Sequence, residues 1–160
     1  MHLDDFDRRI LEQFQNNSRI TSEALGHQIG LSATACQRRL KKLRDSGIIA
    51  KEVAVLSFDD YVTVIVEVVM KRGGTASIES FKSQALQHKE IQQCYYTTGS
   101  ADFIVVVVTP SMAKYEELTR NVFLKNDNIH KFHSTVVMEN VKVGLDIPIG
   151  CENGAIDSVG

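Results

Sequence analysis

The spacing of apolar residues changes near residue 57, and this change divides the chain into two parts. Before it, apolar residues recur every three or four positions, which is typical of amphipathic helices. After it, runs rich in β-branched residues alternate with further helical patterns, which is typical of strands packed against helices. The pattern therefore predicts a helical N-terminal part and an α+β part, which together fit the one or two domains that 160 residues can form.

Three amphipathic helices are expected in the N-terminal part. The first spans about residues 4–16 and has an apolar stripe of Phe6, Ile10, Leu11 and Phe14. Thr21 is placed to cap the second helix, and Gly30 ends it because glycine readily takes the left-handed conformation. Ser32 is placed to cap the third helix, whose apolar face consists of Cys36, Leu40 and Leu43.

Positive charge gathers on the third helix, opposite its apolar face. Residues 31–52 contain six Lys or Arg and two acids, a net +4, whereas residues 53–160 contain nine and thirteen, a net −4. A DNA backbone responds to such a local potential rather than to the total charge of −2. Most cationic helix faces are merely solvated. The two caps, the intervening glycine and the clustered charge together favour the second helix of a DNA-binding helix-turn-helix.

The chain after the third helix indicates a wing and then a connector. Ile48-Ile49 and Val53–Leu56 flank Lys51, a pattern that predicts a short β-hairpin or an extended wing packed on the helices. We therefore expect a winged helix-turn-helix domain at residues 1–50 and a connecting strand and linker at residues 51–61.

The remaining pattern predicts a β-α-β-β-α-β order, which is the ferredoxin-like arrangement, over residues 62–149. The sheet of such a domain carries helices on one face, and its other face would be rich in Val and Ile. We expect a second subunit to cover that face. Residues 150–160 are small and polar and are expected to form a flexible tail. The predicted strands are 62–70, 91–98, 102–109 and 129–143, and the predicted helices are 77–88 and one that follows Ser111.

Other sequence features exclude several classes of protein. The N-terminus has no secretion signal, and the longest apolar runs are too short to span a membrane, so we expect a cytoplasmic protein. Three widely spaced cysteines make neither a disulfide framework nor a zinc site. The scattered histidines argue against a metal-sensing repressor, and we expect no cofactor.

Four collinear motifs of this chain are LDDFDRRILEQFQNNSRI, LSATACQRRLKKLRDSGII, TTGSADFIVVVV and MENVKVGLDIPI. They resemble those of the Lrp/AsnC family of amino-acid-responsive transcription regulators. The resemblance covers about residues 3–149. The chain departs from the family at Ser100, where an acid is common, and at Asn126-Asp127-Asn128, where a Pro-Gly turn is usual.

The resemblance implies a protein that binds double-stranded DNA and forms homodimers and higher oligomers such as octamers. The residues expected to face the groove are Ser32, Thr34, Gln37 and Arg38. The residues expected to contact mainly phosphate are Arg39, Lys41, Lys42 and Lys51. For Arg39 an alternative stays open, in which it pairs with an acid of the first helix.

The resemblance also implies that an effector, an amino acid, binds in clefts between dimers. One wall would be the turn of Thr98, Gly99, Ser100, Ala101, Asp102 and Phe103, and the other a neighbour's His133, Ser134 and Thr135. Gly99 is expected to use its freedom at positive φ in a tight reversal, and Asp102 to meet the ammonium group of the effector. Alternatively, Asp102 only caps the loop's own backbone amides, as Asp often does in turns.

We therefore predict a sequence-specific DNA-binding transcription regulator whose oligomeric C-terminal domain senses an amino acid. Two alternatives remain: a small ferredoxin-like enzyme that uses a pair such as Asp102 and His133 as acid and base, and a family member without an effector. The first would leave the cationic helix unexplained, so we expect no enzymatic activity.

Overall fold

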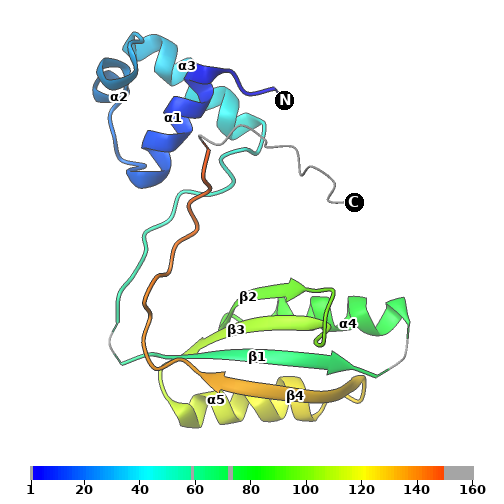
Figure 1. The fold of residues 1–160 in the computed structure, drawn as a ribbon. Coiled ribbons are helices and arrows are strands. Elements are labelled where there is room, and N and C mark those ends of the chain that lie inside the picture. The colour runs from blue at the N-terminus through cyan, green and yellow to red at the C-terminus, as the bar shows by residue number, and fades with distance from the viewer. Residues whose placement is uncertain (1, 59, 72–73, 150–160) are drawn as a thin grey trace, which may run out of the picture. The chain divides into compact units, whose positions relative to one another are not determined.

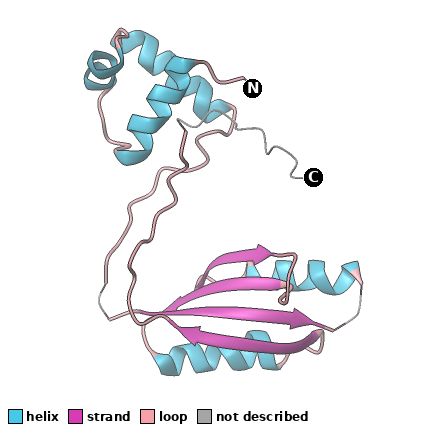
Figure 2. Ribbon diagram, viewed as in Figure 1, coloured by secondary structure: helices cyan, strands magenta, loops and turns pink. Residues whose placement is uncertain are grey.

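The computed structural model describes residues 2–58, 60–71 and 74–149. These residues form two compact units. One contains the chain up to Val55 together with residues from Val143 onward, and the other is Leu56–Lys142. Figure 1 shows that the first unit is helical, and Figure 2 shows that strands occur in the second.

Three helices form the first unit: α1 (Asp5–Asn16), α2 (Ser22–Ile29) and α3 (Ala33–Asp45). Each begins at a side chain that accepts a backbone N–H, which stabilises the helix end. These caps are Asp4, Thr21 and Ser32. The apolar stripes of the helices meet in one core, as their periodicity predicts. That core consists of Ile10, Leu11, Phe14, Leu25, Ile29, Cys36, Leu40 and Leu43.

Two glycines shape the turn between α2 and α3. Gly30 has a φ of 77°, the left-handed conformation predicted for the end of α2. Gly26 was not singled out from the sequence, but a Cβ there would lie 2.4 Å from the carbonyl oxygen of Leu31. The same turn directs the N–H groups of Gly30 and Leu31 to the carbonyl of Gly26, each at 2.9 Å. The close backbone approach therefore requires glycine at position 26.

The structure contains no β-hairpin at the predicted wing, and the alternative of an extended segment is closer to it. Among the described residues between Asp45 and Val62 the structure contains no strand. Ile49 packs against the helical core, but Val53, Val55 and Leu56 are exposed and have no ladder partner to convert their extended pattern into a hairpin. The N-terminal unit is completed instead by residues from Val143 onward, which the sequence pattern had assigned to the ferredoxin-like domain.

The second unit contains a four-stranded antiparallel sheet in the order β2-β3-β1-β4. This is the order expected of the ferredoxin-like arrangement, so that prediction is confirmed. The strands are β1 (Val62–Met70), β2 (Ile91–Tyr96), β3 (Phe103–Thr109) and β4 (Ile129–Val136). The helices are α4 (Thr75–Ala85), α5 (Met112–Thr119) and a π-helical turn, η1 (Arg120–Leu124), that continues α5.

The core of this unit lies between one face of the sheet and the helices. In β1 the residues at alternate positions from Val64 to Met70 are buried. They pack with Phe81 of α4 and with Tyr115 and Leu118 of α5. The opposite face remains open. Its half-buried or exposed apolar side chains are Ile65, Tyr95, Ile104, Val106 and Val108.

Two predicted ends differ from the structure by three residues or more. Helix α4 ends at Ala85 rather than at residue 88, and Leu86 is 89% exposed. Strand β4 ends at Val136 rather than at residue 143, and pairing with β1 continues beyond it only through the bond from the N–H of Val137 to the carbonyl of Thr63. The predicted flexible tail, residues 150–160, lies outside the described residues.

Candidate functional site

Helix α3 presents one continuous polar face. The buried residues Cys36, Leu40 and Leu43 fix its opposite side in the helical core. Burial also raises the pKa of the Cys36 thiol, which fits a core residue rather than a reactive one. Most of the residues predicted to face the groove or to contact phosphate are exposed. They are Ser32, Thr34, Gln37, Arg38, Lys41, Lys42 and Lys51.

Arg39 lies elsewhere. One of its guanidinium nitrogens donates to Oδ2 of Asp4 and to Oδ1 of Asp7, each at 2.7 Å, and its guanidinium carbon lies 5.5 Å from the ring centre of Phe6. The Asp7 side chain is only 4% exposed, so this ion pair offsets part of the cost of burying it. The geometry therefore supports the alternative in which Arg39 pairs with acids of the first helix.

These contacts act on ionisation as well as on packing. The backbone N–H of Asp7 and then the guanidinium of Arg39 hold the pKa of Asp4 below its usual range. In turn, the Asp4 and Asp7 carboxylates raise the pKa of Arg39. Both shifts favour the charged forms, so at neutral pH the ion pair holds α3 against the start of α1.

The remaining cations of this surface differ in their partners. Lys41 bonds to Asp45 at 2.8 Å, and Arg44 bonds to Glu52 at 2.7 Å. Arg38 and Lys42 make no ion pair with any described residue. Since they occupy positions four residues apart on α3, they lie on one side of the helix and can approach a polyanion without breaking another contact.

The predicted effector turn, between β2 and β3, is held by its own hydrogen bonds. Thr97 donates its hydroxyl to the carbonyl of Ala101 at 2.7 Å. The Asp102 carboxylate accepts the N–H of Met70, at the end of β1, at 2.7 Å. Asp102 therefore caps a neighbouring strand, which is close to the alternative role left open for it.

Gly99 does not have the conformation that was expected. The positive-φ glycines of the described chain are Gly30, Gly47 and Gly74, and a Cβ at Gly99 would meet no atom within 4 Å. The reversal is made over several residues, so none of them has to take a left-handed conformation. The prediction that this turn depends on glycine at position 99 is therefore wrong.

The other predicted effector residues are divided between different surroundings. Thr98, Gly99 and Ser100 are exposed at the tip of the turn, whereas Ala101 and Phe103 are buried. The Phe103 ring packs on Phe81 with centres 4.6 Å apart and offers no surface to a ligand.

The predicted residues of β4 point to both faces of the sheet. Ser134 lies on the helix-covered face and hydrogen-bonds the hydroxyl of Tyr115. His133 and Thr135 are exposed and pair in register with Glu67 and Ile65 on the open face. Side chains of His133 and Thr135, but not that of Ser134, are thus available to a partner on that face.

The structure also contains a pocket of about 360 Å³ that the sequence did not predict. The segments before β1 and after β4 form it, because Val137 continues the pairing of β4 with β1 through its N–H to the carbonyl of Thr63. The first segment was expected to be a linker and the second a part of the last strand, and their juxtaposition depends on strand pairing. Its lining residues are Ser57, Phe58, Tyr61, Thr63, Val137, Met138, Glu139 and Asn140.

Among the residues that the structure describes, no three His, Cys, Asp or Glu side chains gather closely enough to hold a metal ion. None of the helices found in the same residues has the length and apolar character needed to cross a membrane.

Two family models match the chain. The AsnC-type helix-turn-helix domain matches residues 3–44, and the Lrp/AsnC ligand binding domain matches residues 63–146. The first match lies within the helical unit, and the second covers the sheet unit from residue 63 and extends to residue 146, into the C-terminal segment of the helical unit. Together they cover more than half of the chain.

Individual relatives agree with these matches. The chain is 43% identical over 152 residues to an uncharacterized HTH-type transcriptional regulator of Sinorhizobium fredii, a match that covers 93% of this chain and 90% of the relative. It is 32% identical to the leucine-responsive regulatory protein of Escherichia coli K12, over 88% of this chain and 87% of that one.

Solved structures give the same result. An AsnC family transcriptional regulator from Agrobacterium tumefaciens superposes with a TM-score of 0.84 at 28% identity and covers 92% of this chain and 97% of its own. A transcriptional regulator from Neisseria meningitidis in complex with L-Met has a TM-score of 0.85 at 25% identity, with 93% and 98% coverage. The polar face of α3, the ferredoxin-like sheet unit and these matches lead to one conclusion: the chain belongs to the Lrp/AsnC family of DNA-binding transcriptional regulators.

Proposed function

We propose that this regulator reads a specific DNA sequence through the exposed face of α3, assembles at least as a dimer through its open sheet face, and responds to an amino acid. The observation that carries the DNA-binding part is the arrangement of α3. The helix is capped by Ser32, fixed to α1 through Arg39, and exposes Thr34, Gln37 and Arg38 on its outer side.

The exposed residues differ in what they can recognise. An arginine can make two hydrogen bonds to the edge of a guanine, whereas a lysine mainly neutralises phosphate. Arg38 lies in the N-terminal half of α3, the part of a recognition helix that contacts bases in helix-turn-helix proteins. Lys42 lies one turn further along the same side. We therefore assign base recognition to Arg38 and phosphate contact to Lys42, with Lys41 and Lys51 as further phosphate contacts.

Arg38→Ala should weaken DNA binding and relax base preference, because it removes a base contact worth about 1–3 kcal/mol. Lys42→Ala is the matched control on the same side of the helix. It should weaken binding to all sequences alike and reduce the dependence of affinity on salt. The measurement is a set of binding titrations, at several salt concentrations, on a sequence selected by the wild type from a random pool and on its single-base variants.

The result that contradicts this assignment is equally clear. If Arg38→Ala retains both the affinity and the base preference of the wild type, α3 does not present Arg38 to the groove. Selection of no preferred sequence by the wild type would instead refute sequence-specific recognition as a whole.

An amino-acid effector is supported by what the relatives' names state and by the turn between β2 and β3. The Escherichia coli relative is named leucine-responsive, and the Neisseria meningitidis structure contains L-Met. In this chain the turn exposes Thr98, Gly99 and Ser100 beside the Asp102 carboxylate. We place one wall of the effector site there, and the other at His133 and Thr135 of a neighbouring subunit.

Asp102→Asn tests this site while keeping the fold. The amide oxygen of the introduced asparagine can still accept the N–H of Met70. In Asp102→Ala, by contrast, that N–H would lose its side-chain partner. The ligand is found first by a thermal-shift screen over all amino acids, in which a true ligand raises the melting temperature with the logarithm of its concentration. Asp102→Asn should then weaken that ligand at least tenfold, because a charge-assisted bond to its ammonium group is lost. Ser100→Ala is the control and should change affinity less.

Equal affinity of wild type and Asp102→Asn, measured by calorimetric titration, would place the effector elsewhere. If no amino acid shifts the melting temperature, the chain is a family member that senses none of them.

A further inference from the structure

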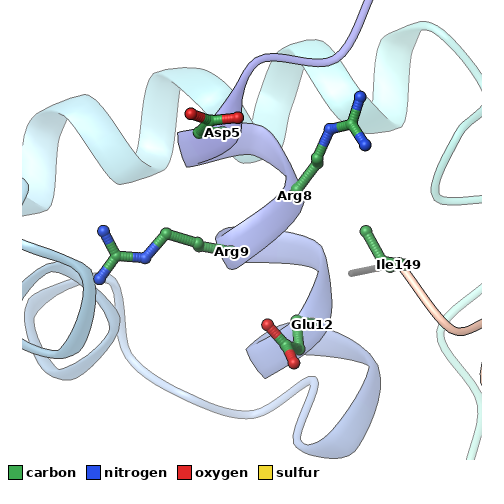
Figure 3. A pocket seen from close by; sticks show the side chains of 5 residues that line it. All are labelled: Asp5, Arg8, Arg9, Glu12 and Ile149. Carbon is green, nitrogen blue, oxygen red and sulfur yellow. The ribbon is translucent and has the colours of Figure 1, made fainter. Parts of the chain in front are cut away.

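The end of the described chain docks on the DNA-binding unit. The side-chain amide of Gln15, on α1, donates to the carbonyl oxygen of Ile147 at 2.9 Å and accepts the N–H of the same residue at 3.0 Å. Two residues later, Ile149 packs against the helical core of that unit. Figure 3 shows the Ile149 side chain beside α1, near Arg8 and Glu12. Neither the wing prediction nor the family motifs anticipated this contact.

The docking uses both backbone polar groups of one residue, Ile147, and one apolar anchor, Ile149. A glutamine amide offers a donor and an acceptor side by side, so it pairs with Ile147 as a neighbouring β-strand would. Apolar residues alternate here at Val143, Leu145, Ile147 and Ile149, a pattern typical of an extended chain. We call residues 143–149 the C-terminal strap.

The strap gives the two units a second covalent connection. The first runs from Ile49, which packs in the helical core, to Val62 at the start of β1, and so has twelve residues, 50–61. The second runs from Val137, which bonds to Thr63 in the sheet unit, to Ile147, which bonds to Gln15, and so has nine residues, 138–146. Two connections limit the movement of the units more than the first alone, because the chain must reach between the units along both of them.

We propose that the C-terminal strap positions the DNA-binding unit for simultaneous contact of two half-sites by a dimer. This inference rests on the proposed dimer. With the strap docked, two helix-turn-helix units of a dimer are held at a narrow range of separations, so binding of one raises the effective concentration of the other at its half-site. With the strap released, the twelve-residue connector lets each unit move over a larger volume, and that effective concentration falls.

The proposal predicts a defect restricted to paired sites. The double variant Gln15→Ala/Ile149→Ser removes both hydrogen bonds and the apolar anchor of the strap. It should bind DNA with two half-sites roughly tenfold more weakly than the wild type does. Its affinity for DNA with one half-site should stay within about twofold of the wild-type affinity. The control is Gln13→Ala/Leu145→Ser, which makes the same chemical changes at positions without these contacts, since Leu145 is exposed and the Gln13 side chain makes no hydrogen bond with described residues.

Two further measurements make the result decisive. Hydrogen exchange should show the Ile147 amide protected in the wild type and unprotected in the double variant. Ile147→Pro removes the same N–H from the strap without changing α1, so it should produce the same paired-site defect even if the double variant lowers the stability of the helices.

The outcomes separate this proposal from the proposed function. A double variant that loses Ile147 protection but retains its full preference for paired sites overturns the strap proposal and leaves the dimeric regulator standing. An unprotected Ile147 amide in the wild type also overturns the strap proposal. A wild type that binds single and paired sites equally well overturns the proposed dimeric DNA binding, and the strap proposal with it.

Discussion

Val106→Glu is expected to convert the protein into a monomer at micromolar concentration. Val106 lies on the open face of the central strand β3, in register with Ile65 of β1 and Gln93 of β2. If a second copy covers this face, the substitution buries an unpaired carboxylate at its centre, which costs about 3–5 kcal/mol. The dissociation constant of the dimer should therefore rise at least 100-fold, and the affinity for paired DNA half-sites should fall with it.

Light scattering and sedimentation over a concentration series measure this effect. Met112→Glu is the matched control, because it also places a glutamate at a partly exposed apolar residue, but on α5, which covers the other face of the sheet. It should leave the oligomer intact. A Val106→Glu protein that stays dimeric at low micromolar concentration would show that the open face is not the subunit interface.

Arg39→Ala should destabilise the DNA-binding unit by about 2–4 kcal/mol, because it leaves the almost fully buried Asp7 carboxylate without its ionic partner. It also removes the packing of the guanidinium on Phe6. Since α3 is then no longer held to the start of α1 by this pair, DNA affinity should fall for every sequence alike. Urea denaturation followed by circular dichroism gives the stability, and binding titrations give the DNA affinity.

Lys41→Ala separates a structural from a phosphate-contacting role on the same helix. Its ion pair with Asp45 is exposed to solvent, so its loss should not change stability measurably but should lower the salt dependence of DNA binding. Arg39→Lys should recover part of the lost stability, because an ammonium group supplies the charge but not the planar guanidinium. Wild-type stability of Arg39→Ala together with weakened DNA binding would instead assign Arg39 to phosphate contact.

Local patterns in the sequence were sufficient for most of the secondary structure. The first helix was expected at residues 4–16 and spans Asp5–Asn16, because a capping side chain and a helical apolar stripe both act within a few residues of their position. The β-branched run at 62–70 became β1 with the predicted bounds. The same reasoning failed at residues 53–56 and 137–143, where an extended apolar pattern continues without a neighbouring strand to pair with.

Side-chain roles were less accessible, because they depend on partners distant in the sequence. The sequence left Arg39 between a phosphate contact and a pair with an acid of the first helix, and the packing of α1 against α3 decided that it meets Asp4 and Asp7. The Asp102 carboxylate was expected to face a ligand, and the sheet pairing brought it to the N–H of Met70, thirty-two residues away. The periodicity of a helix predicts which of its residues are exposed, but it does not predict the contacts of a half-buried charged side chain.

The sequence by itself determined the helix-turn-helix with its cationic helix, the ferredoxin-like order of elements and the family, because periodicity, capping and motif residues are local or collinear signals. Only the tertiary structure decided where the chain's described end lies. The apolar alternation at residues 143–149 is equally suited to extending β4 or to leaving the sheet. The end of pairing with β1, the amide of Gln15 and the space for Ile149 in the helical core together selected the second.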